Sequence, residues 1–549
     1  MRQSPSRDGS PAALASALGW PALALFAAIL AFSFQGSRGI WEPDEGFYVN
    51  ASLGMIRTGD WLVPHLNGLA FLDKPPLHYW GMAAGMLVLG INEWGARMAN
   101  ALLFMGAVLL IGALGRSLYD RATGRLAALL YATTLLPFFA ANILTPDTLL
   151  AFWAASAMLC YARASPGEFE HPVPSPSPAA RGDDLSGIKW GAGPWWLGLG
   201  ATAGLGILAK GPAMLVFLAP AVVHFVHRRG WRGALRSPWG YAAVLVALTI
   251  GGSWYLLVGL ELPGAGAYLL DNQAIGRLAT STYRRNAGLG GGLKVYLPAL
   301  TIGALPWSAF WPLILWRRRA EGGLAFWRGL SRRPADLLLT LWILVPFAVL
   351  LAARSRLVLY TLPLFAPLAL ATARGLILVP KRGARRARPW ILPAAMAAWC
   401  LTLIAAKGLA AALPSEKDTR AIARALDGRH VSRDIRIAVV DRKRNGLPFY
   451  GYSNFAWVTI TRDTYPFFTP VPTLDEELRS GGGSGRGGIG GGGEGGPEGG
   501  VRATRALLVP SSSSTRVAAI MAEAGYLCRN LDPIEDLAVI LCDPAARDR

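Results

Sequence analysis

The sequence predicts an all-α polytopic membrane protein that ends in a smaller α/β domain outside the cytoplasm. Three observations predict this architecture. Of the 549 residues, 53% are hydrophobic and only 16% are charged, whereas a soluble chain carries about a quarter charged residues. The apolar residues form runs of roughly 18 to 23, the length that a membrane-spanning helix needs. The C-terminal part instead contains short apolar segments separated by polar ones.

Residues 1–413 carry the long apolar runs and predict about 11 to 13 transmembrane helices. The first run, residues 18–34, is longer than the core of a signal peptide, so we expect a retained helix. Two segments between runs have a different composition. Residues 164–188 are rich in Pro and Ser and predict a flexible cytoplasmic linker, and residues 259–293 predict a second external loop. The later runs begin near Ala96, Leu126, Thr148, Trp190, Gly211, Trp239, Val295, Asp336, Arg356 and Pro389.

The net charge of +20 invites a nucleic-acid-binding interpretation, but the positions of the basic residues argue against it. They cluster in short segments between apolar runs, around residues 116–125, 228–236, 317–333 and 381–388. This is the positive-inside pattern, which retains such segments in the cytoplasm. We therefore expect membrane lipids as partners and no nucleic acid. With a cytoplasmic N-terminus, the first loop and the tail then lie outside, which is the periplasm if the cell is Gram-negative.

Residues 414–549 predict the α/β domain. Four segments read as strands, residues 435–440, 455–460, 506–510 and 537–542, because each is a short apolar run rich in β-branched or aromatic residues. Residues 421–425 and 517–524 have helical patterns. Residues 481–500 are Gly-rich and predict a disordered insert. Cys528 and Cys542 lie in this tail, and the spacing alone leaves a disulfide between them open.

The first external loop, residues 36–95, gathers charge beside the membrane, where an unpaired charge is costly. Aromatic residues of the kind found at membrane interfaces are interleaved with these charges. Paired prolines at the start of residues 75–90 predict a short amphipathic helix along the membrane. The acidic residues in this loop are Glu42, Asp44, Glu45, Asp60, Asp73 and Glu93, and Lys74 lies among them.

Asp147 opens a later apolar run on the same outer side, so two acidic sites share one membrane surface. Simple structural interpretations remain open for each candidate. Asp44 and Glu45 could be solvated loop carboxylates, and Lys74 an interfacial anchor that extends toward water. Asp147 could cap the helix that it begins.

Several motifs in these segments resemble the lipid-linked-sugar glycosyltransferases of the GT-C fold, in the branch of aminoarabinose transferases and protein O-mannosyltransferases. The resemblance covers roughly the first 370 residues and depends on the order of the motifs. The motifs are PDEGFY (43–48), GDWLVPHLNG (59–68), DKPPLHYW (73–80), NEWGAR (92–97), TPDTLL (145–150), AKGP (209–212) and SRLVLYTLPLF (355–365).

The resemblance implies that a sugar moves from a polyprenyl phosphate to an acceptor at the outer face. Asp44 corresponds to the essential loop aspartate, Asp147 to a second acidic position near the site, and Lys74 to a lysine near the donor phosphate. Tyr360 falls in a motif associated with donor phosphate contact. Glu45 belongs to the same loop motif and is a candidate for substrate binding.

Transfer leaves a polyprenyl phosphate with growing negative charge, which Lys74, with Lys210 or Arg356, could stabilise in a partly dry site. Asp44 could accept a proton from an acceptor hydroxyl. An acceptor phosphate is already largely ionised, and Asp44 would then position the acceptor or a metal. A divalent metal stays open as a cofactor, with Asp73 and His65 as candidate ligands. Tyr283 stands near the position where aminoarabinose transferases have a histidine.

The sequence therefore predicts a multi-pass glycosyltransferase of the inner membrane that transfers a hexose or pentose to lipid A, a glycan or a protein. The alternative is a transporter or flippase of lipid-linked sugars. Transporters bind substrate near mid-membrane with broken helices and repeats, whereas here the acidic residues gather in an outer loop. A receptor-like protein would leave this loop unexplained.

Overall fold

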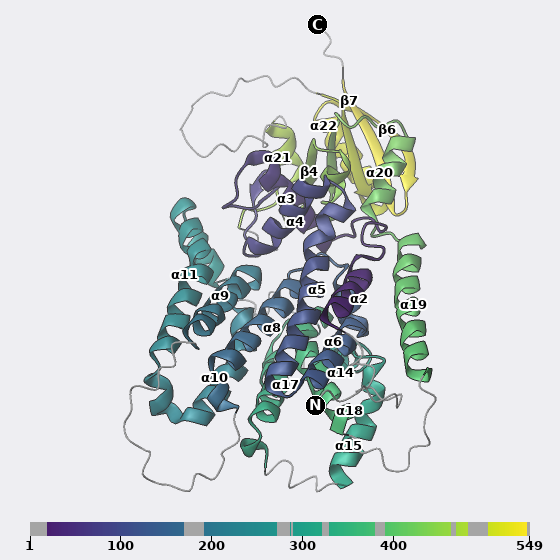
Figure 1. Cartoon of the computed structure of the whole chain (residues 1–549). Helices are drawn as coiled ribbons and strands as arrows, with labels where there is room; N and C mark the ends of the chain where they lie inside the picture. Colours follow the sequence, from purple (N-terminus) through teal and green to yellow (C-terminus); the bar gives the residue numbers. More distant parts are fainter. Residues whose placement is uncertain are drawn as a thin grey trace, which may run out of the picture. The chain divides into compact units, whose positions relative to one another are not determined.

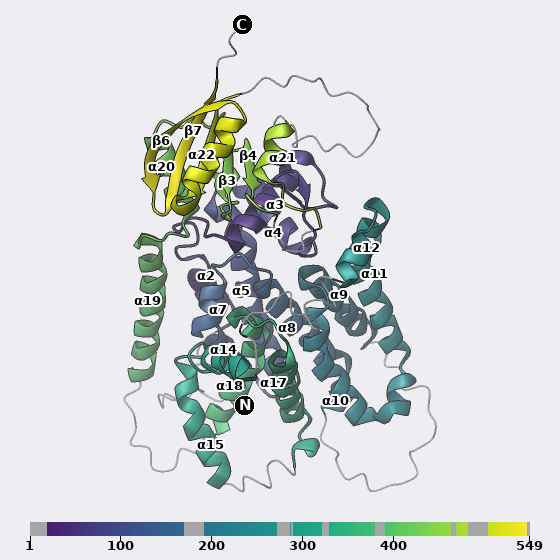
Figure 2. The same cartoon turned by 180° about the vertical axis from the view of Figure 1, so that it is seen from behind.

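The computed structural model describes residues 19–169, 192–271, 286, 289–320, 329–378, 390–462, 468–480 and 503–545. The chain divides into two compact units, each built from two segments far apart in sequence (Figures 1 and 2). The first contains Met1–Ser33 and Asn100–Gly408, and the second contains Phe34–Ala99 and Leu409–Arg549. The predicted insert at 481–500 and most of the predicted linker lie outside the described residues. The domain boundaries drawn from the sequence stay predictions.

The first unit is helical throughout its described residues, as the apolar runs predict. Among the residues that the structure describes, five helical segments are long and apolar enough to cross a membrane: α5, α11, α17, residues 358–378 and α19. The chain is therefore a multi-pass membrane protein. Its helices are α2 (Trp20–Phe32), α5 (Glu93–Leu118, which begins in the second unit), α6 (Arg121–Ala132), α7 (Leu135–Ala140), α8 (Asp147–Ala164), α9 (Gly193–Lys210), α10 (Ala213–Leu235), α11 (Pro238–Glu261), α12 (Ala265–Tyr268), α14 (Leu289–Thr301), α15 (Trp311–Ala320), α17 (Pro334–Ala352), η8 (Val358–Leu364), α18 (Phe365–Leu378) and α19 (Ile391–Ala412).

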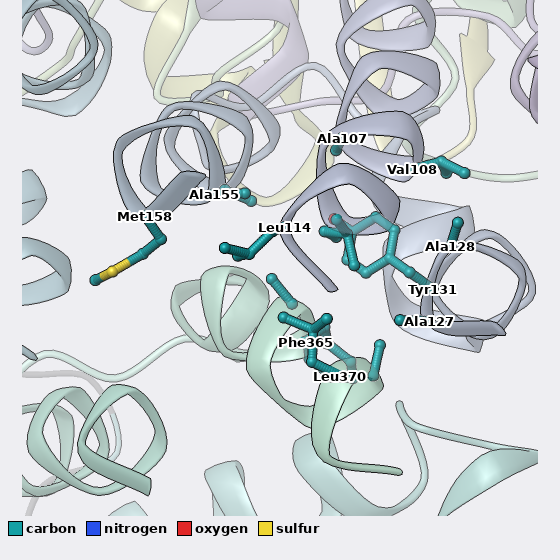
Figure 3. Close-up of a cluster of buried hydrophobic side chains, with 14 of the residues drawn as sticks. Ala107, Val108, Leu114, Ala127, Ala128, Tyr131, Ala155, Met158, Phe365 and Leu370 are labelled. Carbon is teal, nitrogen blue, oxygen red and sulfur yellow. The ribbon is translucent and has the colours of Figure 1, made fainter. Parts of the chain in front are cut away.

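Small residues let the helices of this unit approach closely. Figure 3 shows side chains of α5, α6, α8 and α18 gathered in one buried cluster around Tyr131. A Cβ on Gly115 of α5 would lie only 2.7 Å from the Cα of Gly124 in α6, so these two backbones meet without a side chain between them. Such small-residue contacts are the usual means of packing helices in a membrane, where burial in lipid supplies no extra driving force.

The outer faces of the helices are apolar, which fits their contact with lipid. On α11, large apolar side chains with half or more of their surface exposed recur along the whole helix. An exposed apolar surface of this size is unusual for a soluble protein. The residues are Tyr241, Val244, Leu245, Leu248, Leu256, Leu257 and Leu260. The helix ends at Glu261, close to residue 259, where the predicted second external loop begins.

The second unit combines the first loop with the tail. The loop forms α3 (Asp44–Thr58), a short hairpin of β1 (His65–Leu66) and β2 (Leu69–Ala70), and α4 (Leu77–Leu89), which begins after the paired prolines as predicted. The tail forms a five-stranded sheet of order β4-β3-β5-β7-β6. The strands are β3 (Arg436–Val440), β4 (Phe455–Val458), β5 (Arg505–Pro510), β6 (Tyr526–Ile534) and β7 (Leu537–Pro544).

Strands β4, β3 and β5 are mutually parallel, whereas β7 is antiparallel to both of its neighbours, β5 and β6. Helices α21 (Leu474–Arg479) and α22 (Ser514–Glu523) pack their apolar residues on one face of the sheet, and Figures 1 and 2 show α20 (Thr419–Gly428) on the opposite face. All four predicted strands and both predicted helices are confirmed. The α/β tail is therefore as the sequence predicts, with β6 and α21 added.

The two cysteines of the tail form a disulfide between neighbouring strands. Cys528 of β6 stands directly opposite Cys542 of β7, with the two Cα atoms 4.1 Å apart. Cys160 and Cys400 are free, as their positions in apolar runs suggest. The pairing that the sequence left open is thus present in the structure.

Candidate active site

The predicted loop aspartate, Asp44, begins helix α3. It is exposed, whereas Glu45 beside it is buried. Pro43 is the N-cap residue and supplies no side-chain hydrogen bond. A carboxylate in the first turn is stabilised by the helix dipole. Asp44 therefore presents its carboxylate at the surface of the second unit, in a position favourable to its ionised form.

Glu45 lies in a network of buried charges. Its Oε1 and Oε2 accept hydrogen bonds from the Nη2 and Nη1 of Arg38 at 2.6 and 2.9 Å. Arg97 adds a contact of 3.1 Å to Oε2, and the backbone N–H of Trp41 another of 2.9 Å. Burial alone would raise the pKa of Glu45, but the guanidinium groups of Arg38 and Arg97 outweigh it and lower the pKa to about 2. This geometry suits an anchor for the loop more than a substrate contact.

Arg97 extends this anchor to the backbone before α3. Its side chain is completely buried and donates to the carbonyl oxygens of Arg38 at 2.7 Å and Gly39 at 2.8 Å. The motif NEWGAR contains Arg97, but its pairing with Glu45, 52 residues away, is not readable from the motif. The segment that leads to Asp44 is thus fixed by a residue whose role sequence reasoning missed.

Glu42 is a second buried carboxyl that sequence reasoning missed. Its Oε1 accepts hydrogen bonds from the hydroxyl of Thr419 at 3.0 Å and the backbone N–H of Gly446 at 2.6 Å. Burial raises the pKa of Glu42 to about 8, although these hydrogen bonds oppose the shift. The neighbouring Ile40 N–H donates to the Tyr450 hydroxyl at 2.9 Å. These contacts join the first loop to the tail within the second unit.

Lys74 is paired with the residue before it. Its Nζ lies 2.6 Å from the Oδ2 of Asp73 and 3.1 Å from the carbonyl oxygen of Asp73. The two side chains are only 10% and 15% exposed. The structure thus holds a cation in a mostly buried position at the start of α4.

The two weak metal candidates do not converge. The carboxylate of Asp73 contacts Lys74, and the Nδ1 of His65 lies 3.6 Å from the Oδ2 of Asp60. Within the described ranges, no group of three or more His, Cys, Asp or Glu residues is arranged to hold a metal ion.

In the first unit, Asp147 and Lys210 form a buried ion pair. Asp147 is the first residue of α8 and Lys210 the last of α9, and their side chains are 6% and 10% exposed. The Nζ of Lys210 also lies 4.3 Å from the ring centroid of Tyr360, in a cation–π contact. The carboxylate of Asp147 faces this lysine, and the N-cap position of α8 is occupied by Pro146. Three predicted site residues therefore meet at one point.

Arg356 belongs to the same unit, is buried and donates hydrogen bonds to backbone carbonyl oxygens. Its Nη1 donates to the carbonyl oxygen of Asn286 at 2.7 Å and its Nη2 to that of Leu351 at 2.8 Å. Tyr360 packs against the cluster that contains Tyr296, a buried tyrosine that sequence reasoning missed. Tyr283 lies outside the described residues. The predicted residues thus fall into two groups, with Asp44, Glu45, Asp73 and Lys74 in one unit and Asp147, Lys210, Arg356 and Tyr360 in the other.

Known proteins match both the sequence and the fold. Residues 16–266 match the family model of dolichyl-phosphate-mannose-protein mannosyltransferase. The chain is 29% identical over 357 residues to an undecaprenyl phosphate-alpha-4-amino-4-deoxy-L-arabinose arabinosyl transferase of Edwardsiella ictaluri, covering 65% of this chain and 59% of that protein. It is 30% identical over 348 residues to the transferase of the same name from Pseudomonas aeruginosa (strain LESB58), covering 62% and 56%.

The crystal structure of ArnT from Cupriavidus metallidurans bound to undecaprenyl phosphate matches with a TM-score of 0.70 and 18% identity. That match covers 95% of this chain and 98% of the other. The chain therefore has the fold of this ArnT structure and is similar in sequence to the aminoarabinose transferases. The GT-C fold expected from the sequence is confirmed. In the sequence alignments, the chain spans less than two thirds of the length of the Edwardsiella ictaluri and Pseudomonas aeruginosa transferases.

Proposed function

We propose that this protein is a membrane glycosyltransferase that moves a sugar from a polyprenyl phosphate to an acceptor at the periplasmic face. One observation carries the proposal. Each unit holds a lysine in a mostly buried position against an aspartate, Lys74 with Asp73 and Lys210 with Asp147. Buried ion pairs add little net stability, and charge beside a membrane usually marks function. Each of these lysines is therefore a candidate for binding the phosphate of a lipid-linked donor.

The chemistry follows from these positions. The acceptor oxygen attacks the anomeric carbon of the sugar, the bond from that carbon to the phosphate oxygen breaks, and polyprenyl phosphate leaves. Lys74 or Lys210 would stabilise the negative charge that develops on the leaving phosphate, since preorganised cations act strongly where water is excluded. Asp44 would take the proton of an acceptor hydroxyl. For a phosphate acceptor, which is already ionised, Asp44 would orient it instead.

The lysines also bear on the cofactor question. In this proposal a lysine, Lys74 or Lys210, supplies the positive charge at the donor phosphate, so transfer would continue when divalent metal is removed with a chelator. A chelator that abolishes transfer, with recovery on adding Mg²⁺ or Mn²⁺, would instead require a bound metal.

The finer points of the proposal have separate support. The names of the curated relatives support a pentose on undecaprenyl phosphate as the donor. The disulfide between Cys528 and Cys542 supports a periplasmic tail, because disulfides persist in oxidising compartments. The comparisons give the transporter alternative no support. The acceptor is lipid A, a glycan or a protein, and the modified molecule in the experiment below identifies it.

The experiment is mass spectrometry of envelope lipids and glycoproteins from a deletion strain complemented with wild type, Asp44→Asn or Asp475→Asn at equal membrane expression. Asp475 is an exposed carboxylate on α21 and provides the matched control. We expect a pentose-sized increment with wild type and Asp475→Asn and its loss with Asp44→Asn. A hexose-sized increment would replace the pentose. Full activity of Asp44→Asn would remove Asp44 from the site, and the absence of any increment would contradict the transferase.

A further inference from the structure

A groove at one end of the first unit is not used by the proposed reaction. It has a volume of about 600 Å³ and lies between α2, α5 and α8. Its floor is apolar and consists of Pro21, Ala24, Leu109, Leu110, Ala113 and Leu159. Arg116 and Arg163 also line it. An apolar channel with cations is chemically suited to an amphiphile.

Helix geometry puts the two arginines at the same end of the groove. Arg116 follows Leu109 by seven residues on α5, which is about 10 Å along the helix axis. Arg163 follows Leu159 by one turn on α8, and both arginines lie in the last turn of their helices. Trp20, at the start of α2, reaches the same level, since a Cβ on Gly112 would lie 3.0 Å from its ring. Tryptophan prefers this interfacial position in membrane proteins.

The positive charge of the two arginines is not neutralised by a carboxylate among the residues that the structure describes. Asp120, close to Arg116 in sequence, is bonded to Arg374 at 3.2 Å and caps α6. Glu168, close to Arg163, is bonded to Arg229. The guanidinium of Arg163 instead stacks 4.5 Å from the ring centroid of Trp195, which fixes its position. The groove therefore has charge to offer an anionic ligand.

We propose that this groove binds an anionic glycerophospholipid, with an acyl chain along the apolar floor and the phosphate at Arg116 and Arg163. Charge complementarity selects this occupant. The N-terminal residues 1–18 precede Trp20 and are another candidate, but they carry Arg2 and Arg7 against Asp8 alone, which matches two arginines poorly. The positive-inside pattern puts this end of the helices in the cytoplasmic leaflet, where anionic lipids attract basic residues.

The inference concerns selectivity, because any lipid can lie against a membrane protein. Native mass spectrometry of the purified full chain would measure retained phosphatidylglycerol against phosphatidylcholine. We expect wild type to retain phosphatidylglycerol preferentially and the double variant R116Q/R163Q to lose that preference by about tenfold, since each basic residue near an anionic lipid contributes measurably. The variant R232Q/R236Q removes the same charge from an exposed segment at the end of α10 and should keep the preference.

A third variant tests the apolar floor without changing charge. Ala113→Phe fills the groove and should reduce phosphatidylglycerol retention although both arginines remain. Equal retention of the two lipids by wild type would overturn the proposal. So would an unchanged preference in R116Q/R163Q, or loss in R232Q/R236Q to the same extent. If Ala113→Phe has no effect, or if added undecaprenyl phosphate displaces the lipid at equal concentration, the site is not the proposed one. None of these outcomes depends on the transferase activity.

Discussion

The carboxyl groups of Glu42 and Glu45 are buried three residues apart on the same segment, and their surroundings shift their pKa values in opposite directions. Glu45 is bonded by two guanidinium groups, whereas Glu42 receives hydrogen bonds from a hydroxyl and an amide. The pKa is therefore lowered to about 2 for Glu45 and raised to about 8 for Glu42. Asp44, the proposed catalytic residue, lies between them in sequence.

The pKa of Glu42 predicts a pH dependence of stability. The unfolded carboxyl loses its proton near 4.5 and the folded one near 8, so the folded state holds an additional proton between these values. Stability must therefore fall as pH rises through this window. Glu42→Gln keeps an acceptor oxygen for Thr419 and Gly446 and cannot ionise. We expect it to flatten the decline in thermal unfolding measured at successive pH values.

Glu523→Gln is the control for this measurement, because Glu523 is an exposed residue on α22. It should retain the wild-type slope between pH 4.5 and about 8. A wild-type slope in Glu42→Gln as well would contradict the neutral state of Glu42.

The network around Glu45 predicts a large loss of stability. Glu45→Gln would leave the buried guanidinium groups of Arg38 and Arg97 without their counter-ion, which costs about 3 to 5 kcal/mol for a buried pair. The lowered pKa of Glu45 has the opposite sign to that of Glu42, since its stabilisation is present above 4.5 and is lost as pH falls toward 2. Thermal unfolding at neutral pH would measure the loss, with Glu523→Gln again as control. A variant as stable as wild type would show that the network is not stabilising.

The Asp147–Lys210 pair predicts a catalytic defect. Lys210→Gln and Asp147→Asn should each reduce transfer by about 100-fold or more, as expected when one preorganised charge is removed from an active site. Because the two residues act as a unit, the double variant should cost little more than either single one. Transfer from a polyprenyl-phosphate donor in purified form would measure this.

Lys294→Gln serves as the control for the lysine, because Lys294 is an exposed residue of α14 in the same unit. It should leave the rate unchanged. Additive losses in the double variant would mean that Asp147 and Lys210 act separately.

The disulfide of the tail leads to two expectations, one for the thermal stability of the protein and one for the compartment in which the tail lies. Cys528 and Cys542 close a loop of 14 residues in sequence separation, for which cross-linking stabilises by about 3 kcal/mol. The variant C528S/C542S should unfold at lower temperature. Thiol labelling of denatured wild type without reductant should modify Cys160 and Cys400 only. Labelling of all four cysteines in freshly isolated membranes would place the tail in a reducing compartment.

Much of the fold could be predicted because its signals are local. Long apolar runs predicted the helices of the first unit, and short apolar runs predicted β3, β4, β5 and β7. Strand β6 was missed because most of its residues are polar or exposed and it is an edge strand. No apolar run marks such a strand, and its partner β7 is recognised only in three dimensions.

Individual residues of the candidate site could be predicted from the sequence, but the contacts between them could not. Asp147 and Lys210 were each selected from a motif, but their pairing across 63 positions was not. Glu45 was assigned to substrate, and its actual neighbours Arg38 and Arg97 come from segments on either side of it. Glu42 was named among the charges of the loop without a role, because its partners lie in the tail. Pairings between distant segments depend on the fold, which motifs do not describe.

The hydrogen bonds of Glu42 have a consequence for the order of synthesis. Thr419 lies 377 residues after Glu42, and Gly446 lies 404 residues after it. The segment around Asp44 leaves the ribosome early, yet its buried carboxyl gains these partners only when most of the polypeptide has been translated. The loop that carries Asp44 is therefore made early but gains these contacts late, and the nascent chain lacks them while the intervening helices enter the membrane.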